Sequence, residues 1–272
     1  MKRIQLVEFE DLPWFPNWLR QCMTIYLQSL HRMLGTAELI EPLVRRGLRG
    51  SNVIIDLCSG AGGPMIDVTK ALRSNPDYAA TTLVLTDLYP NHQTITSLQE
   101  TGHGWIRYEV QAIDAATVPP KLLGLRTMIC CFHHMPPAVA KNILQDAASQ
   151  KQPFLAFEIS DNSSPFWFWW LAIPIVFCLS LVLTIWVRPL SMRQLLFTYC
   201  IPIIPAFIAW DGAVSNARTY TPADLNELLT QIDTVDYKWE ISTVKSQNLP
   251  SPMLYILGLP KDENELCGVS YK

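Results

Sequence analysis

Short apolar segments alternate with amphipathic stretches between residues 17 and 159 of this 272-residue chain. Apolar runs bounded by turn residues are typical of strands buried on both faces, and apolar residues repeating every three or four positions are typical of helices. The alternation predicts an α/β fold, in which right-handed crossovers join parallel strands into a doubly wound, Rossmann-like sheet. The predicted strands are 53–57, 82–86, 106–110, 126–132 and 154–159, and the predicted helices are 17–34 (capped by Asn17), 37–48, 65–73, 91–101 and 137–149.

The same pattern returns near the C-terminal end. Residues 211–220, D-G-A-V-S-N-A-R-T-Y, are predicted to form a loop. Thr221 and Pro222 are a strong helix start, and that helix is expected to reach about residue 232. Residues 237–244 and 253–259 alternate between apolar and polar, and N-L-P-S-P separates them. They predict an edge pair that completes a seven-stranded sheet whose last strand is antiparallel.

Between these two parts lies a long apolar interruption. Residues 162–187 contain no charged side chain, and a second apolar run covers 194–210. About twenty helical residues span the hydrocarbon core of a bilayer. Trp167, Trp169 and Trp170 stand at one end of the first run and Trp186 near the other, as in an interfacial aromatic belt. An inserted apolar helical hairpin is therefore expected, with a buried helix pair in a soluble core as the alternative.

These patterns divide the chain into four regions. They are an N-terminal helical cap (1–50), a core (51–161 and 211–260), the hairpin (162–210) and a polar tail (261–272) that is expected to fray. In the cap, Trp14, Phe15 and Trp18 are expected to be packing residues, and a membrane-facing or lid role is the alternative.

Composition and charge exclude some functions. The net charge of −3 offers no general attraction for nucleic acid. Seven cysteines without C-x-x-C spacing predict reduced, mostly buried thiols in an intracellular protein, and no metal site is expected. Glu8, Glu10 and Asp11 stand where a secretory signal would need its apolar stretch, so no such signal is expected.

The turn after the first predicted strand carries the clearest chemistry. The sequence V-I-I-D-L-C-S-G-A-G-G-P places Gly60, Gly62 and Gly63 between a strand and a helix start. Glycines allow a tight turn and close backbone approach to a ligand, and the exposed N–H groups of a helix start favour an anionic or polar ligand group. A Walker loop would need G-K-S/T, which is absent. Binding of NAD is the runner-up, but the glycine spacing of G-x-G-x-x-G fits poorly.

The spacing D-x-x-x-G-x-G-G resembles the first motif of class I S-adenosylmethionine-dependent methyltransferases. Asp87 matches that family's acid at the end of the second strand, which receives the ribose hydroxyls. Asp114 stands where the family places an acid against the adenine amine, and Cys131-Phe132-His133 matches the segment beside the methionine part. The resemblance implies S-adenosylmethionine as cofactor. The cofactor-binding residues it implies are Asp56, Cys58, Ser59, Gly60, Gly62, Asp87, Leu88, Asp114, Ala115 and Phe132.

Candidate catalytic residues lie at the ends of the fourth and fifth predicted strands. They are His133, His134 and Glu158, of which a histidine could act as general base, although a structural role is the alternative. The sequence H-H-M-P-P lacks the acid or amide and the closing aromatic of amine-methylating relatives, so methylation of DNA or protein amines is disfavoured. Arg218 is expected to pair with Asp211 or to bind an anionic acceptor.

The hairpin suggests where the methyl group would go. An apolar insert on the rim of the cofactor site favours a hydrophobic small-molecule or lipid acceptor at a membrane. Sheet strands lie on both sides of the insert, so both its ends must lie on one membrane face, expected to be cytoplasmic. Arg188 and Arg193 at its tip oppose the positive-inside tendency, so a two-pass hairpin and a monotopic one both stay open. The alternatives are a non-catalytic module that oligomerises through the hairpin, and a soluble methyltransferase whose insert packs between subunits.

Overall fold

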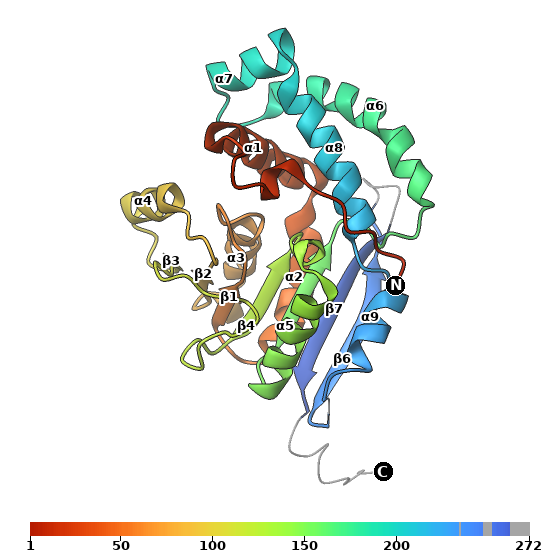
Figure 1. The fold of residues 1–272 in the computed structure, drawn as a ribbon. Helices are drawn as coiled ribbons and strands as arrows, with labels where there is room; N and C mark the ends of the chain where they lie inside the picture. The colour runs from red at the N-terminus through yellow and green to blue at the C-terminus, as the bar shows by residue number, and fades with distance from the viewer. Residues whose placement is uncertain (234, 247–251, 262–272) are drawn as a thin grey trace.

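A mixed seven-stranded sheet forms the centre of the molecule (Figure 1). The computed structural model describes residues 1–233, 235–246 and 252–261. The strand order is β3-β2-β1-β4-β5-β7-β6, and β7 is antiparallel to both of its neighbours. The strands are β1 (Val53–Asp56), β2 (Thr82–Leu85), β3 (Ile106–Tyr108), β4 (Leu125–Ile129), β5 (Phe154–Glu158), β6 (Tyr237–Val244) and β7 (Met253–Pro260).

Helices cover both faces of the sheet because consecutive strand residues point to opposite sides. On one face, Ile55 and Met128 pack with α5 (Pro137–Ser149) and α9 (Pro222–Leu229). On the other face, Ile54 and Leu155 pack with α2 (Thr36–Leu48), α3 (Met65–Arg73) and α4 (His92–Thr101). The predicted doubly wound α/β sheet with seven strands and a reversed last strand is confirmed.

A third core lies beyond the carboxyl ends of the parallel strands. There α1 (Asn17–Leu34) packs against a hairpin made of α6 (Phe166–Leu183), α7 (Met192–Leu195) and α8 (Ile203–Arg218). Figure 1 shows these helices together at the top of the view, above the sheet. Phe15, Met23 and Tyr26 of the N-terminal part meet Ile204 and Ile208 of α8 in this core. The insert is therefore a second layer built onto the edge where ligands of such sheets bind.

Helix α6 of the hairpin carries polar side chains on its buried side and apolar side chains on its exposed side. Its buried side carries Ser180, and Thr184 follows just past its end. Both hydroxyls donate to backbone carbonyls one turn earlier, at 2.7 and 2.8 Å. Its large aliphatic residues face outward instead, and Leu171 and Ile175 are 64% and 62% exposed. A soluble core helix would show the opposite arrangement.

Two local predictions about helix boundaries are wrong. Pro16, not Asn17, occupies the cap position of α1, and no side chain caps that end; the Asn17 side chain accepts a bond from Arg20 instead. Residues 211–220 are not a loop, because α8 continues through them to Arg218. The continued helix buries Ala213, Val214 and Ala217, and this packing offsets the cost of a glycine within the helix.

The predictions about the N-terminal aromatic residues and the cysteines are confirmed only in part. Phe15 is buried and Trp18 packs against Phe197, but Trp14 is 67% exposed, so only the first two are packing residues. The six described cysteines are unpaired, yet Cys178 and Cys200 are exposed on the hairpin, so the prediction of mostly buried thiols is wrong there. The predicted fraying tail, beyond residue 261, and most of the N-L-P-S-P connection lie outside the described residues.

Candidate cofactor and methyl-acceptor site

The turn between β1 and α3 is built on residues with left-handed backbone conformations. Cys58, Gly60, Gly62 and Gly63 have φ values of 56°, 52°, 88° and 41°. A Cβ on Gly62 would lie 2.5 Å from Ile66 Cδ1, whereas one on Gly60 would meet nothing within 4 Å. The turn thus needs glycine at position 62 for packing. At position 60, glycine leaves open space next to the backbone, where a ligand can approach closely.

Asp87, the acid predicted at the end of the second strand, lies directly beside this turn. Asp87 follows β2, and its Oδ2 accepts the N–H of Gly60 at 2.8 Å, while its Oδ1 accepts the N–H of Tyr89, also at 2.8 Å. Parallel neighbouring strands end at the same sheet edge, which brings these residues together. Each carboxylate oxygen keeps a second lone pair for an incoming hydroxyl group.

Beneath the turn, Asp56 is a buried anchor. Its Oδ1 accepts the hydroxyl of Thr127 on β4 at 2.7 Å, and its carbonyl oxygen accepts the hydroxyls of Ser59 and Thr86. Burial raises the pKa of Asp56 from 3.8 to about 7. The side chain therefore joins β1 to β4 under the turn, at the place where the motif requires an acid.

The remaining predicted cofactor residues surround the same edge. The N–H of Ile113 donates to the Asp87 carbonyl at 2.9 Å, so the loop that carries Asp114 runs next to Asp87. Asp114 and Leu88 are exposed, whereas Ala115 and Phe132 are buried in one apolar cluster with Ile113. Their contacts with a cofactor stay predictions. Tyr108 was missed: its hydroxyl donates to the Gly60 carbonyl at 3.0 Å, and only the end of β3 signals it.

Of the three candidate catalytic residues, His133 and Glu158 contact each other, and His134 lies next to His133. Glu158, at the end of β5, accepts the backbone N–H of His133 at 3.0 Å and faces His133 Nδ1 at 2.8 Å. The ring of His134 lies 4.3 Å from the His133 ring, centroid to centroid. A carboxylate can only accept hydrogen bonds, so His133 Nδ1 carries the proton and its Nε2 is left to face other groups.

The sequence pattern did not predict the group that His133 Nε2 faces. Residues 1–16, which we call the N-terminal strap, cross this edge of the sheet, and the backbone of Ile4 donates to the Ala217 carbonyl of α8 at 2.8 Å. Glu8 of the strap is 0% exposed, and its Oε1 lies 3.8 Å from His133 Nε2. Burial raises the pKa of Glu8 to about 7. No local sequence pattern reveals this contact, because the partners lie far apart in the chain.

Arg218 and Asp211 do not pair with each other, as the sequence had suggested they would. Arg218 Nη1 lies 2.6 Å from Asp11 Oδ2 and 3.1 Å from Glu8 Oε1. The carboxylate of Asp211 instead accepts the backbone N–H groups of Phe9 and Glu10, at 2.8 and 3.3 Å. Both side chains of α8 therefore hold the strap in place.

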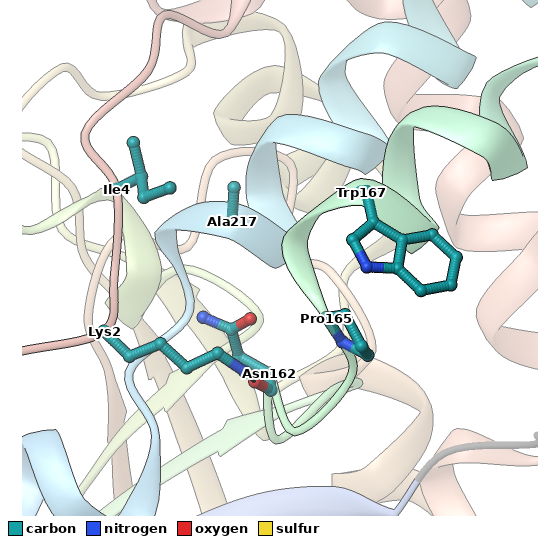
Figure 2. Close-up of a pocket in the computed structure, with 6 residues that line it drawn as sticks. All are labelled: Lys2, Ile4, Asn162, Pro165, Trp167 and Ala217. Atoms are coloured by element: carbon teal, nitrogen blue, oxygen red, sulfur yellow. Dashed lines mark hydrogen bonds between the residues drawn. The ribbon is translucent and has the colours of Figure 1, made fainter.

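A hollow of about 350 Å³ lies where the strap meets the foot of the hairpin (Figure 2). Figure 2 shows the Trp167 ring on one side and the extended Lys2 side chain on the other. Lys2 Nζ donates to backbone carbonyls of the 162–164 segment, including that of Ser164 at 3.0 Å. None of the predicted cofactor residues lines this hollow, so it is separate from the glycine turn.

Comparison with known proteins agrees with this architecture. No family model and no curated protein matches the sequence. Among solved structures, the plantazolicin methyltransferase BpumL in complex with SAH matches with a TM-score of 0.52 at 10% identity, over 90% of this chain and 98% of that chain. The plantazolicin methyltransferase BamL, in complex with a triazolic desmethylPZN analog and SAH, matches with a TM-score of 0.51 at 10% identity over the same shares. This chain has the class I, Rossmann-like methyltransferase fold.

Proposed function

We propose that this protein is an S-adenosylmethionine-dependent methyltransferase that works at a membrane surface on a small hydrophobic or lipid-like acceptor. The contact between Gly60 and Asp87 carries the proposal, since it joins an open glycine turn to a strand-end acid at the ligand edge of this fold. The neighbours of known structure were crystallised with SAH, which supports the same cofactor here.

The residues at the edge suit the parts of that cofactor. The open backbone at Gly60 suits the carboxylate of the methionine part, Asp87 suits the ribose hydroxyls, and the exposed carboxylate of Asp114 suits the adenine amine. Phe132 belongs to the segment that the resemblance places beside the methionine part, and its side chain is 2% exposed, so it would support that part from within the core. The cofactor supplies an electrophilic methyl group on a sulfonium centre.

The pair of His133 and Glu158 suits deprotonation of an acceptor hydroxyl. The acceptor lone pair forms the new bond to the methyl carbon, the carbon–sulfur bond breaks with its electrons staying on sulfur, and His133 Nε2 takes the acceptor proton. Glu158 holds the imidazole tautomer and balances the charge that develops on it. Glu8 covers Nε2, so the strap must move before an acceptor can reach this base.

The hairpin supports action at a membrane. One segment, Trp167–Trp186, is long and apolar enough to cross a bilayer, and only 11% of its most apolar stretch is buried, unlike a soluble core helix. Trp167 and Trp186 at its ends are 52% and 53% exposed. The second arm bends by 81° between residues 200 and 203, and Arg188 is exposed at the tip. The bend and the charged tip favour a monotopic hairpin, lying in the interface on the cytoplasmic side.

Calorimetry with S-adenosylmethionine tests the cofactor. We expect micromolar binding, weakened by about 10-fold or more in Asp87→Ala through loss of charge-assisted hydrogen bonds. Asp77→Ala, at an exposed acid in the short helix after α3, is the matched control and should bind as the wild type does. Absence of binding of both S-adenosylmethionine and SAH to the wild type would refute the proposal.

Vesicle flotation and methyl transfer test the membrane and the acceptor. The triple variant Leu171→Gln, Ile175→Gln, Leu179→Gln should lose flotation with vesicles while keeping cofactor affinity, because these side chains face outward. Radiolabelled methyl groups should enter a lipid extract rather than an aqueous one. A wild type that stays in solution without detergent as a dimer or larger assembly would instead assign the apolar face to contact between subunits.

A further inference from the structure

The cluster under the strap carries more negative than positive fixed charge. Glu8, Asp11 and Glu158 contribute three carboxylates, and Arg218 supplies one guanidinium in direct contact with the first two. Arg3 donates to the His133 carbonyl but does not touch a carboxylate of the cluster in the described chain. A buried excess of negative charge is costly unless protons or a cation neutralise it.

Glu8 lacks the partners that burial normally requires. Both of its carboxylate oxygens are buried without a hydrogen-bond donor, whereas Nδ1 of His134 has no aligned hydrogen bond but lies 3.0 Å from Asp11 Oδ1. Arg218 Nη1 approaches Glu8 Oε1 at 3.1 Å, but the contact is not aligned as a hydrogen bond. Unpaired acceptors that converge on one point are the arrangement a cation would complete.

The distances between the converging atoms fit a metal ion. Oε1 of Glu8 is 3.8 Å from Nε2 of His133, its Oε2 is 3.6 Å from Nδ1 of His134, and one ligand atom from each residue lies within 4.8 Å of the others. Metal–ligand bonds of about 2.0–2.1 Å in a tetrahedron separate the ligands by roughly 3.3 Å. Side-chain shifts of up to about 1.5 Å would therefore bring the three ligand atoms to these separations.

The surroundings are those of a metal-bound histidine. Glu158 fixes the proton of His133 on Nδ1, so Nε2 presents its lone pair towards Glu8, as in carboxylate–histidine–metal arrangements. Without a cation or a proton on Glu8, that lone pair would face a carboxylate oxygen. Arg218 and a metal ion can both contact the Glu8 carboxylate, because a carboxylate offers about four lone-pair directions.

We propose that Glu8, His133 and His134 bind one divalent transition-metal ion of the zinc type, with Glu158 as the positioning residue. Two imidazoles and one carboxylate suit Zn²⁺, Co²⁺ or Fe²⁺ better than Mg²⁺ or Ca²⁺. The ion links the N-terminal strap to the ends of β4 and β5. With the ion bound, Nε2 of His133 has no free lone pair, so its use as the base in the proposed methyl transfer requires the metal-free protein. Metal binding can be tested without S-adenosylmethionine.

The test is metal binding by the full-length protein in detergent after removal of metals with a chelator. Titration with Co²⁺, followed by its visible absorption, should show one ion bound per chain, and Zn²⁺ should displace it. Glu8→Gln and His134→Asn should each lower the affinity by about 100-fold or more, and Glu158→Gln by about 10- to 100-fold. His103→Asn, at an exposed histidine after α4, is the matched control and should bind as the wild type does.

Circular dichroism checks that each variant is folded, and His134, which is only partly buried, gives the variant most tolerant of substitution. No uptake of Co²⁺ or Zn²⁺ by the wild type at micromolar concentration would overturn the proposal and leave protons as the neutralising charge. Uptake unchanged by both Glu8→Gln and His134→Asn would overturn it as well, by placing the ion elsewhere.

Discussion

Gly60 and Gly62 stand two positions apart in one turn, yet a side chain at each would meet different surroundings. Gly60 has φ of 52° and open space beside it, whereas at Gly62 a Cβ would contact Ile66 and Leu85 at 2.5 and 3.2 Å. Backbone conformation thus favours glycine at both positions, and packing requires it at position 62.

These differences predict unequal effects of two alanine substitutions. Gly60→Ala should lower the free energy of unfolding by about 1 kcal/mol, from strain alone, and Gly62→Ala by about 2–3 kcal/mol, from strain and overpacking. Urea denaturation measures both. Equal losses would show that the two positions have the same environment, contrary to the structure.

The raised pKa of Asp56 predicts a pH dependence of stability. Its pKa is about 7 when folded against 3.8 as the ordinary value, so between these pH values the folded state binds more protons than the unfolded one. Stability contributed by this group therefore falls as pH rises from about 4 to 7. The unfolding free energy of the wild type minus that of Asp56→Asn should fall by about 3 kcal/mol over this range. A difference that is flat with pH would contradict the burial of this acid.

At the scale of elements, the sequence predicts helix starts from local patterns but does not predict contacts between distant segments. The helix start at Thr221 was predicted from its capping residue, and the structure shows it as a capping box; the helix predicted over 91–101 is also present, with Asn91 as its cap. The extension of α8 was missed because Gly212 and its polar neighbours resemble a loop. The partners of Asp211 lie at Phe9 and Glu10, and no single sequence shows contacts between such distant segments.

The pairing of β4 with α5 depends on a buried charge. Arg126 is 1% exposed, and its guanidinium donates to Asp146 at 2.6 Å and to Gln150 at 2.9 Å. Arg126→Ala should lower the free energy of unfolding by about 3 kcal/mol, because it leaves Asp146 without its counter-charge. Combining Arg126→Met with Asp146→Asn should recover much of this loss in the same denaturation experiment. A double variant as unstable as the single one would attribute the loss to packing.

At the scale of the whole molecule, the strap joins three parts of the fold. It contacts His133, just after β4, through Glu8, the hairpin through Asp211, and α9 through the Lys2 backbone, which donates to Asp224. Sequence patterns predicted the sheet and the hairpin, because both follow from local periodicity. They did not predict that the first residues would cover the candidate base, because that contact depends on how the finished fold places the termini of its elements.

Removing one anchor should loosen the strap without unfolding the sheet. In Asp211→Ala the N–H groups of Phe9 and Glu10 lose their acceptor, so their hydrogen exchange should accelerate by about 10-fold or more. Exchange in β1 and β4 should stay as in the wild type. Asp77→Ala should change neither region. Acceleration across the whole chain would mean that Asp211 supports the entire fold rather than the strap.

The strap also sets an order of events during synthesis. Residues 4–11 leave the ribosome long before Asp211, Ala217 and Arg218, which hold them and emerge only after most of the hairpin has been made. The strap therefore cannot dock until the apolar hairpin has emerged and packed. The candidate base beneath the strap is covered last, so an unfinished chain exposes His133 and Glu158, and a finished fold conceals them.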